Sequence, residues 1–124
     1  MALEKHELKI ATTGGAGVAT GSGILSLPIC ELLAIYLNYH ASAPATTDVT
    51  VTSTGDPSSV TLLTRSNSAA DGWFYPKVQD HDNVAASIAG SYSHPTIHAG
   101  ALTISVAQAD ALTDCLIATV YVKV

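Results

Sequence analysis

Two short clusters of acidic and histidine side chains lie close together in the sequence and could do chemistry. The first is QDHDN at 79–83, and the second is HPTIH at 94–98. Carboxylate and imidazole groups are competent ligands for transition metals. Asp80, His81, Asp82, His94 and His98 are all of these types, and one hypothesis is therefore a metal-dependent hydrolase that uses His81, Asp82, His94 and His98.

The spacing of these residues argues against a shared metal. Pro95 lies between His94 and His98, and the segment that follows has the alternation of a strand, so the two imidazoles are not expected one helical turn apart. In an extended backbone, residues 80–82 would point alternately to opposite sides. We therefore predict no metal and no cofactor, with histidines that are exposed or hydrogen-bonded in a loop.

Nucleophilic catalysis has no recognisable motif in this chain. Serines are frequent, but none lies in a GxSxG elbow. Cys30 and Cys115 are in apolar runs and outside any CxxC pair, which predicts buried free thiols. The glycine-rich stretch at 14–23 lacks the Lys-Ser/Thr end of a phosphate loop and reads as a cluster of turns. We predict that the protein is not an enzyme.

The elements that would position these residues are short strands separated by turns. Runs that alternate or are rich in β-branched residues occupy 6–10, 48–54, 101–107 and 115–124. Residues 30–40 suit a helix face or a buried strand, and the all-β context favours the strand. About seven or eight strands predict one all-β domain, a β-sandwich or jelly roll. Residues 1–10 would form an N-terminal arm or edge strand, and 11–124 the sandwich.

One long segment does not fit a compact sandwich. After WFYP at 73–76, about twenty residues pass before the strand near Ala101, and loops longer than roughly 12–15 residues are usually functional or disordered. Alternation sends Trp73 and Tyr75 one way and Phe74 the other. We predict a long loop excursion that contacts a neighbouring protein through Trp73, Tyr75, Val84, Ile88, Tyr92, His94 and Ile97.

The composition narrows the possible partners. The chain is 48% hydrophobic and only 12% charged, whereas about 25% charged is usual for a soluble domain. Its net charge of −5, with only 5 Lys and Arg, argues against nucleic-acid binding. No apolar run reaches the roughly 18 residues that span a membrane, and the first ten residues lack a signal peptide's pattern. We expect a soluble protein made in a cytoplasm.

Five segments, taken in order, carry a resemblance to a known family. They are the strand around Leu33, Ile35 and Tyr36 or Leu37, TTDVTVTSTG at 46–55, FYPKVQDHD at 74–82, HPTIHAGALTISVAQ at 94–108 and LIATVYVKV at 116–124. In this order the chain resembles the small β-rich head decoration, or cement, proteins of tailed bacteriophages. It departs from the family where ADALTDC replaces a glycine-rich turn in the last hairpin, and where Lys77 replaces the commoner Arg.

The resemblance implies a non-catalytic virion structural protein. Such a protein lies on the capsid surface, binds the major capsid protein and stabilises its lattice, after synthesis in the host cytoplasm. It also implies self-association as a homotrimer or another homo-oligomer. The alternative from a different class is a phage tail or baseplate β-sandwich that binds host glycan through Trp73 and Tyr75.

Overall fold

The computed structural model describes residues 2–55, 58–98 and 100–124. In these ranges the chain forms strands and no helix, which confirms the predicted all-β fold. The strands are β1 (Leu3–Ile10), β2 (Ala19–Ser26), β3 (Cys30–Tyr39), β4 (Asp48–Thr54), β5 (Val60–Arg65), β6 (Gly72–Phe74), β7 (Val78–His81), β8 (Ser87–Ser93), β9 (Thr96–Ile97), β10 (Ala101–Ala109) and β11 (Leu116–Lys123). The described ranges hold no helix long and apolar enough to cross a membrane.

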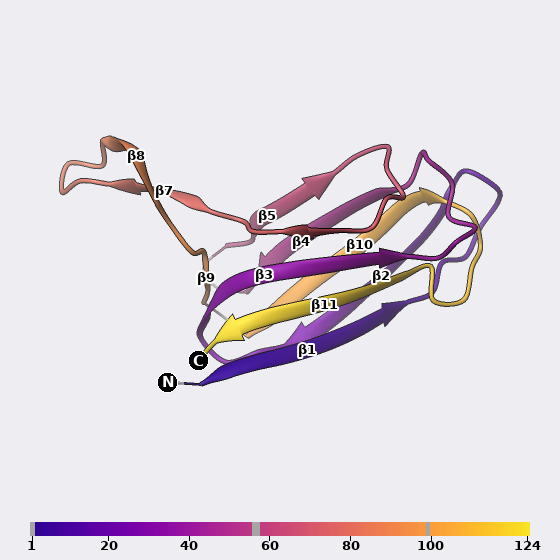
Figure 1. The fold of residues 1–124 in the computed structure, drawn as a ribbon, viewed down its shortest axis with the longest axis horizontal. Helices are drawn as coiled ribbons and strands as arrows, with labels where there is room; N and C mark the ends of the chain where they lie inside the picture. Colours follow the sequence, from indigo (N-terminus) through magenta and orange to yellow (C-terminus); the bar gives the residue numbers. More distant parts are fainter. Residues whose placement is uncertain (1, 56–57, 99) are drawn as a thin grey trace.

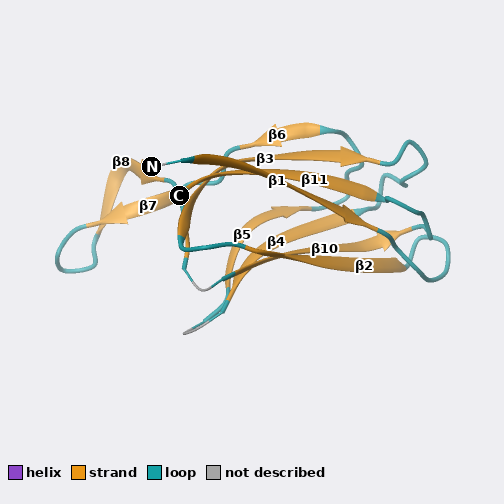
Figure 2. Cartoon of the chain, turned by 90° about the horizontal axis from the view of Figure 1, so that it is seen from below, coloured by secondary structure: helices purple, strands orange, loops and turns teal. Residues whose placement is uncertain are grey.

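The strands form two packed sheets and a separate hairpin. One sheet has the order β1-β11-β3-β6, with β9 also paired to β3, and the other has the order β2-β10-β4-β5. Figure 2 shows the two sheets stacked as layers with their strands roughly aligned, which is the geometry of a β-sandwich. The third sheet is the hairpin β7-β8, which extends beyond one end of the layers (Figure 1).

Residues 30–39 form a strand rather than a helix because their burial follows a period of two. Ile35, Leu37 and Tyr39 are buried, whereas Tyr36 and Asn38 lie on the outer side. The strand is central in its sheet, since β11 pairs along almost its whole length on one side and β6 and β9 pair on the other. Two paired sides satisfy its backbone hydrogen-bonding groups, which leaves the inner side chains free to build the core.

The core lies between the two layers. Each sheet contributes every second side chain of its central strands, as expected for strands buried on one face. The largest fully buried side chains are Ile10, Leu32, Ile35, Leu37, Ile97, Leu102, Ile104, Leu116, Val49, Val51, Val106 and Val120. Cys30 and Cys115 are buried free thiols, as predicted.

The glycine-rich stretch is partly a strand, which corrects its interpretation as a cluster of turns. Residues from Ala19 onward form β2 at the edge of the four-stranded sheet. A Cβ atom on Gly21 would lie 2.1 Å from the carbonyl oxygen of Ala11, and one on Gly23 would lie 2.8 Å from Cδ2 of Leu8. The alternate glycines therefore allow the start of the chain to approach β2 closely at this edge of the sandwich.

The N-terminal segment is an edge strand of the five-stranded sheet. Residues from Leu3 to Ile10 pair in register with β11. Reciprocal backbone hydrogen bonds of 2.9 and 2.8 Å between Ala2 and Val124 extend this ladder and hold the two ends side by side. The charged residues of β1 therefore lie on the body of the molecule, where their positions are fixed by the ladder.

The outer face of the four-stranded sheet carries mainly hydroxyl side chains. In one row across the sheet Ser105 lies opposite Ser22 and Thr50, and in the next row Thr103 lies opposite Thr52. Thr103 and Thr54 are also joined by a hydrogen bond of 3.0 Å between their hydroxyl groups. The low fraction of charged residues is consistent with this outer face, where most side chains are Ser or Thr and few are ionised.

Candidate functional site

A projecting hairpin is the most exposed feature of the molecule. We call residues 78–93 the arm: they comprise β7, a turn at 82–86 and β8. The two strands pair with each other and, among the described residues, with no third strand. Both views show the arm extending away from the end of the sandwich (Figures 1 and 2). The predicted long loop is thus wrong in detail, because most of this excursion is an antiparallel hairpin.

Polar side chains hold one side of the arm together. The carboxylate of Asp80 accepts hydrogen bonds from the hydroxyl groups of Ser91, at 2.6 Å, and Ser93, at 2.5 Å. Because both bonds favour the charged form, the pKa of Asp80 lies below its ordinary value of 3.8. Cross-strand hydrogen bonds of this kind explain why a segment without hydrophobic alternation still forms strands.

The turn of the arm is organised by Asp82. Its Oδ1 atom accepts hydrogen bonds from the backbone amides of Val84, at 2.9 Å, and Ala86, at 3.0 Å. The backbone amide of Asp82 donates to the carbonyl of Ala86 at 2.9 Å. Ala85 has a φ of 63°, in the left-handed region. The turn is therefore closed by its own side chain and backbone, in the manner of an Asx turn.

Apolar side chains of the arm are left uncovered. Val84 is 75% exposed at the turn, and Ile88 and Tyr92 are 42% and 58% exposed on β8. Tyr92 lies opposite Gln79 in the ladder, whereas its neighbours Ser91 and Ser93 bond to Asp80. Tyr92 and Asp80 therefore occupy opposite sides of the hairpin. Val78, which is 43% exposed, lies opposite Ser93 and therefore on the side of Asp80. Exposed apolar side chains thus lie on both sides of the arm and at its turn, and no other strand of the described residues covers them.

Of the five candidate metal ligands, all except His98 make local contacts. His94 lies at the base of the arm with the ammonium of Lys77 3.1 Å from its Nδ1 atom. His81 lies 3.4 Å from the hydroxyl of Ser87 through its Nε2 atom, while Asp82 organises the turn. His98 is half-buried beyond β9. In the described ranges no group of three or more His, Cys, Asp or Glu residues is arranged to hold a metal ion.

The outer side of the five-stranded sheet carries a cluster of aromatic rings. We call Tyr36, Trp73, Tyr75 and Tyr121 the aromatic face. The ring of Trp73 lies with its centroid 4.9 Å from that of Tyr36, 5.5 Å from that of Tyr121 and 6.5 Å from that of Tyr75. Phe74 points inward and packs against the core, which confirms the predicted alternation. Trp73 and Tyr75 remain 49% and 62% exposed.

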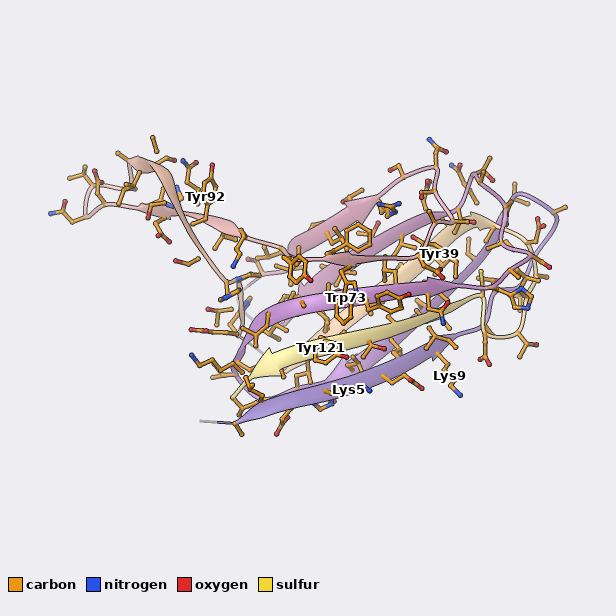
Figure 3. The ribbon with its side chains drawn as sticks, viewed as in Figure 1. Lys5, Lys9, Tyr39, Trp73, Tyr92 and Tyr121 are labelled. Atoms are coloured by element: carbon orange, nitrogen blue, oxygen red, sulfur yellow. The ribbon has the colours of Figure 1, made fainter. Side chains whose placement is uncertain are left out.

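Lysines border the aromatic face along β1 and β11. Lys5 lies opposite Tyr121 in the ladder, and Lys9 lies opposite Ile117. Lys123 continues the same side of β11, opposite Leu3 and Glu31. Figure 3 shows Lys5 and Lys9 along β1, with Trp73 and Tyr121 over the middle of the sheet and Tyr92 far away on the arm.

The predicted contact residues thus lie in four different places. Trp73 and Tyr75 belong to the aromatic face, and Val84, Ile88 and Tyr92 belong to the arm. His94 is half-buried at the base of the arm. Ile97 requires a correction, because it is fully buried in β9 opposite Cys30 and is part of the core.

Sequence reasoning missed two members of the aromatic face. Tyr36 pairs directly with Trp73, and Tyr121 comes from the last strand. Each lies between two buried residues: Tyr36 between Ile35 and Leu37, and Tyr121 between Val120 and Val122. That alternation is a signal in the sequence that both tyrosines face outward, but it does not reveal that the two strands are neighbours.

An open pocket of about 330 Å³ lies where β3, β9 and the C-terminus meet. It is lined by Ile29, Cys30, Glu31, Thr96, Lys123 and Val124. Burial, with a smaller contribution from the charge of Glu4, raises the pKa of the Cys30 thiol. A raised pKa keeps this thiol protonated at neutral pH, so Cys30 is a poor nucleophile.

Comparisons with known proteins supply no relative: no family model, no curated protein and no solved structure matches this chain.

Proposed function

We propose that this chain is a virion structural protein, a head decoration protein that binds the major capsid protein of a tailed phage and stabilises its lattice without catalysis. The observation that carries the proposal is the arm. It projects from a compact sandwich and exposes Val84, Ile88 and Tyr92 without covering them. A two-stranded hairpin is only marginally stable alone in water, so this arrangement suits a hairpin that becomes covered by a neighbouring protein.

The body of the sandwich supports the same proposal. Its Ser- and Thr-rich outer face, in rows such as Ser22, Ser105 and Thr50, has few charges to desolvate on contact with another protein. Many weak contacts, repeated over a closed shell, add up to strong attachment when the copies are linked to one another. The five segments that resemble the decoration proteins follow the same order along this chain. This resemblance supports a phage capsid as the shell to which the protein binds.

Binding to undecorated capsids tests the proposal. Capsids assembled from the major capsid protein of the virus that encodes this chain are mixed with purified protein and sedimented. We expect saturable binding in a fixed ratio to the capsid subunits. Replacement of the exposed arm residue Ile88 by Asp should weaken binding, because it places a charge in an apolar contact. The matched control is Val18→Asp, at a valine that is 68% exposed in the turn before β2 and outside both the arm and the Ser- and Thr-rich face. Absence of saturable binding by the unmodified protein would refute the proposal.

A second candidate function rests on the aromatic face. Exposed aromatic rings beside polar groups suit the stacking of sugar rings, and Trp73 is the central ring of the cluster. On this alternative the chain is a tail or baseplate protein that binds host glycan. Glycan-array binding that disappears in Trp73→Ala supports it, and binding that is absent or unchanged in that variant excludes it.

A further inference from the structure

The pocket between β3, β9 and the C-terminus has apolar side chains on its walls. Ile29 and Val124 line it and are among the large hydrophobic side chains that the molecule exposes. Leu3, which is also exposed, lies opposite Lys123, another lining residue. Contiguous exposed apolar groups mark interaction surfaces, whereas scattered ones do not. This end of the sandwich therefore carries a hollow with apolar walls that is separate from the arm and from the aromatic face.

Polar groups at the pocket are placed to meet a peptide backbone. Glu31 lies opposite Lys123 on one side and opposite Thr96 on the other. Within the described part of the chain the one ion pair joins His6 to Glu4, so the carboxylate of Glu31 and the ammonium of Lys123 do not bind each other. The carboxylate can accept a hydrogen bond from a backbone amide, and the ammonium can donate one to a carbonyl.

The size and shape of the pocket suit one side chain of another protein. Its volume of about 330 Å³ is at the lower end of the roughly 300–1,000 Å³ that is usual for small-molecule sites, and those sites enclose most of the surface of the ligand. This pocket is open to solvent. In protein interfaces, a large side chain that fills such a hollow contributes much of the binding energy. We therefore expect an apolar anchor side chain as the occupant.

The fold places the pocket beside the arm. Only residues 94 and 95 separate the end of β8 from Thr96, which lines the pocket. The carbonyl of Pro95 accepts a hydrogen bond of 2.9 Å from the amide of Leu32, and β9 pairs with β3. In Figure 1, β9 lies between the arm and the two ends of the chain. A protein that covers the arm is therefore within reach of the pocket.

We propose that this pocket anchors an apolar side chain from an extended segment of the capsid subunit that contacts the arm. The side chain would pack between Ile29 and Val124 and cover Cys30. The backbone of the segment would form hydrogen bonds with Glu31 and Lys123. This inference rests on the proposed function, because it takes the partner of the arm as the source of the segment. It adds a second contact at which that partner is held.

Filling the pocket tests the inference. Thr96→Trp adds a large uncharged side chain at an exposed position of the pocket wall. It should weaken saturable binding to undecorated capsids by roughly tenfold or more, as expected for the loss of an anchoring contact. The matched control is Thr113→Trp, at an exposed threonine in the turn between β10 and β11, at the opposite end of the sandwich (Figure 1). Both variants should keep the thermal unfolding midpoint, and the control should bind with unchanged affinity.

The thiol of Cys30 provides a second measurement that needs no variant. Cys30 lines the pocket, whereas Cys115 is fully buried in the core. Iodoacetamide in mildly alkaline buffer, where the thiolate is more abundant, should label Cys30 slowly in the free protein. Binding to saturating capsids should slow this labelling roughly tenfold or more, as the bound fraction dictates. Mass spectrometry measures the labelling, and Cys115 is the internal control that should stay unlabelled.

The outcomes separate the inference from the proposed function. Absence of saturable binding by the unmodified protein refutes the proposed function, and the inference with it. Saturable binding with unchanged affinity in Thr96→Trp, or with Cys30 labelled at the same rate in the free and bound states, overturns the inference alone. Weaker binding of Thr96→Trp together with protection of Cys30 confirms it.

Discussion

Asp80 orders a hairpin that has no hydrophobic core of its own. Its carboxylate accepts hydrogen bonds from Ser91 and Ser93 on the opposite strand. Such bonds favour the ionised carboxylate over the protonated acid, since the charged oxygens are the better acceptors. Because the arm is exposed, water weakens the contribution of these hydrogen bonds to the free energy of unfolding. We therefore expect Asp80 to stabilise the folded arm and to have no effect on the stability of the sandwich.

The titration of Asp80 is the first prediction. Its pKa in the folded arm lies below the ordinary value of 3.8, so the stabilisation is complete above that value and is lost as the pH falls through the folded pKa. Carbon NMR of the side-chain carboxyl group should give a midpoint below 3.8. Ser91→Ala combined with Ser93→Ala should raise the midpoint. A midpoint at or above the ordinary value in the unmodified chain would show that these hydrogen bonds are not formed.

The second prediction concerns Gly21, which lies where the start of the chain approaches β2 closely. Gly21→Ala would place a methyl group 2.1 Å from the carbonyl oxygen of Ala11, and the backbone would have to move. We expect a loss of roughly 1–3 kcal/mol in the free energy of unfolding, measured in urea. The matched control Ser22→Ala, on the exposed side of the same strand, should change it by no more than about 0.5 kcal/mol. Equal effects at the two positions would contradict the close approach of the chain to β2.

The arm and the sandwich are separate elements in energetic terms. The core draws its side chains mainly from the two large sheets, which include Ile97 of β9. The arm contributes no residue to the buried cluster. Local units with few buried apolar contacts open more readily than the rest of a protein. The arm should therefore exchange its backbone amide hydrogens faster than β3, β10 or β11.

Replacement of the arm is the third prediction. Residues 78–93 are exchanged for a short Gly-Ser turn, with Pro95 and β9 retained because the carbonyl of Pro95 accepts a hydrogen bond from Leu32 at 2.9 Å. The free energy of unfolding of the sandwich should change by less than about 1 kcal/mol, because only an exposed loop is shortened. Capsid binding should be lost, because the exposed apolar side chains of the arm are removed. A sandwich that fails to fold without the arm would show that the arm has a structural role within its own chain.

At the scale of the strand, period-two patterns predicted much of the fold and only part of the candidate site. Alternation identified β3, β4, β10 and β11, and it placed Trp73 and Phe74 on opposite sides of their strand. It did not identify the arm, since Asp80 and the serines that bind it have no hydrophobic period. The pattern also did not predict the full aromatic face. Tyr36 lies beside Trp73 because β3 pairs with β6, and the alternation within one strand does not reveal which strands pair.

For the whole molecule, low charge and uncovered surface are related features. Only 12% of the residues are charged, and three of the five Lys and Arg border the aromatic face. A freely diffusing domain usually keeps apolar patches small and charges well distributed. This chain instead exposes an arm with uncovered apolar side chains, an aromatic face and a hydroxyl-rich face. Such a distribution suits a molecule that acts with most of its surface covered by neighbours.

The central claim is that these neighbours belong to a capsid lattice. On the proposed function a tailed phage encodes this chain, and cryo-electron microscopy of its particles tests the claim most directly. The account predicts one regular density for this sandwich per repeating unit on the outer surface of the capsid, at positions that bridge adjacent capsid subunits. Capsid shells that lack this density, or density for the chain confined to the tail, would contradict the account.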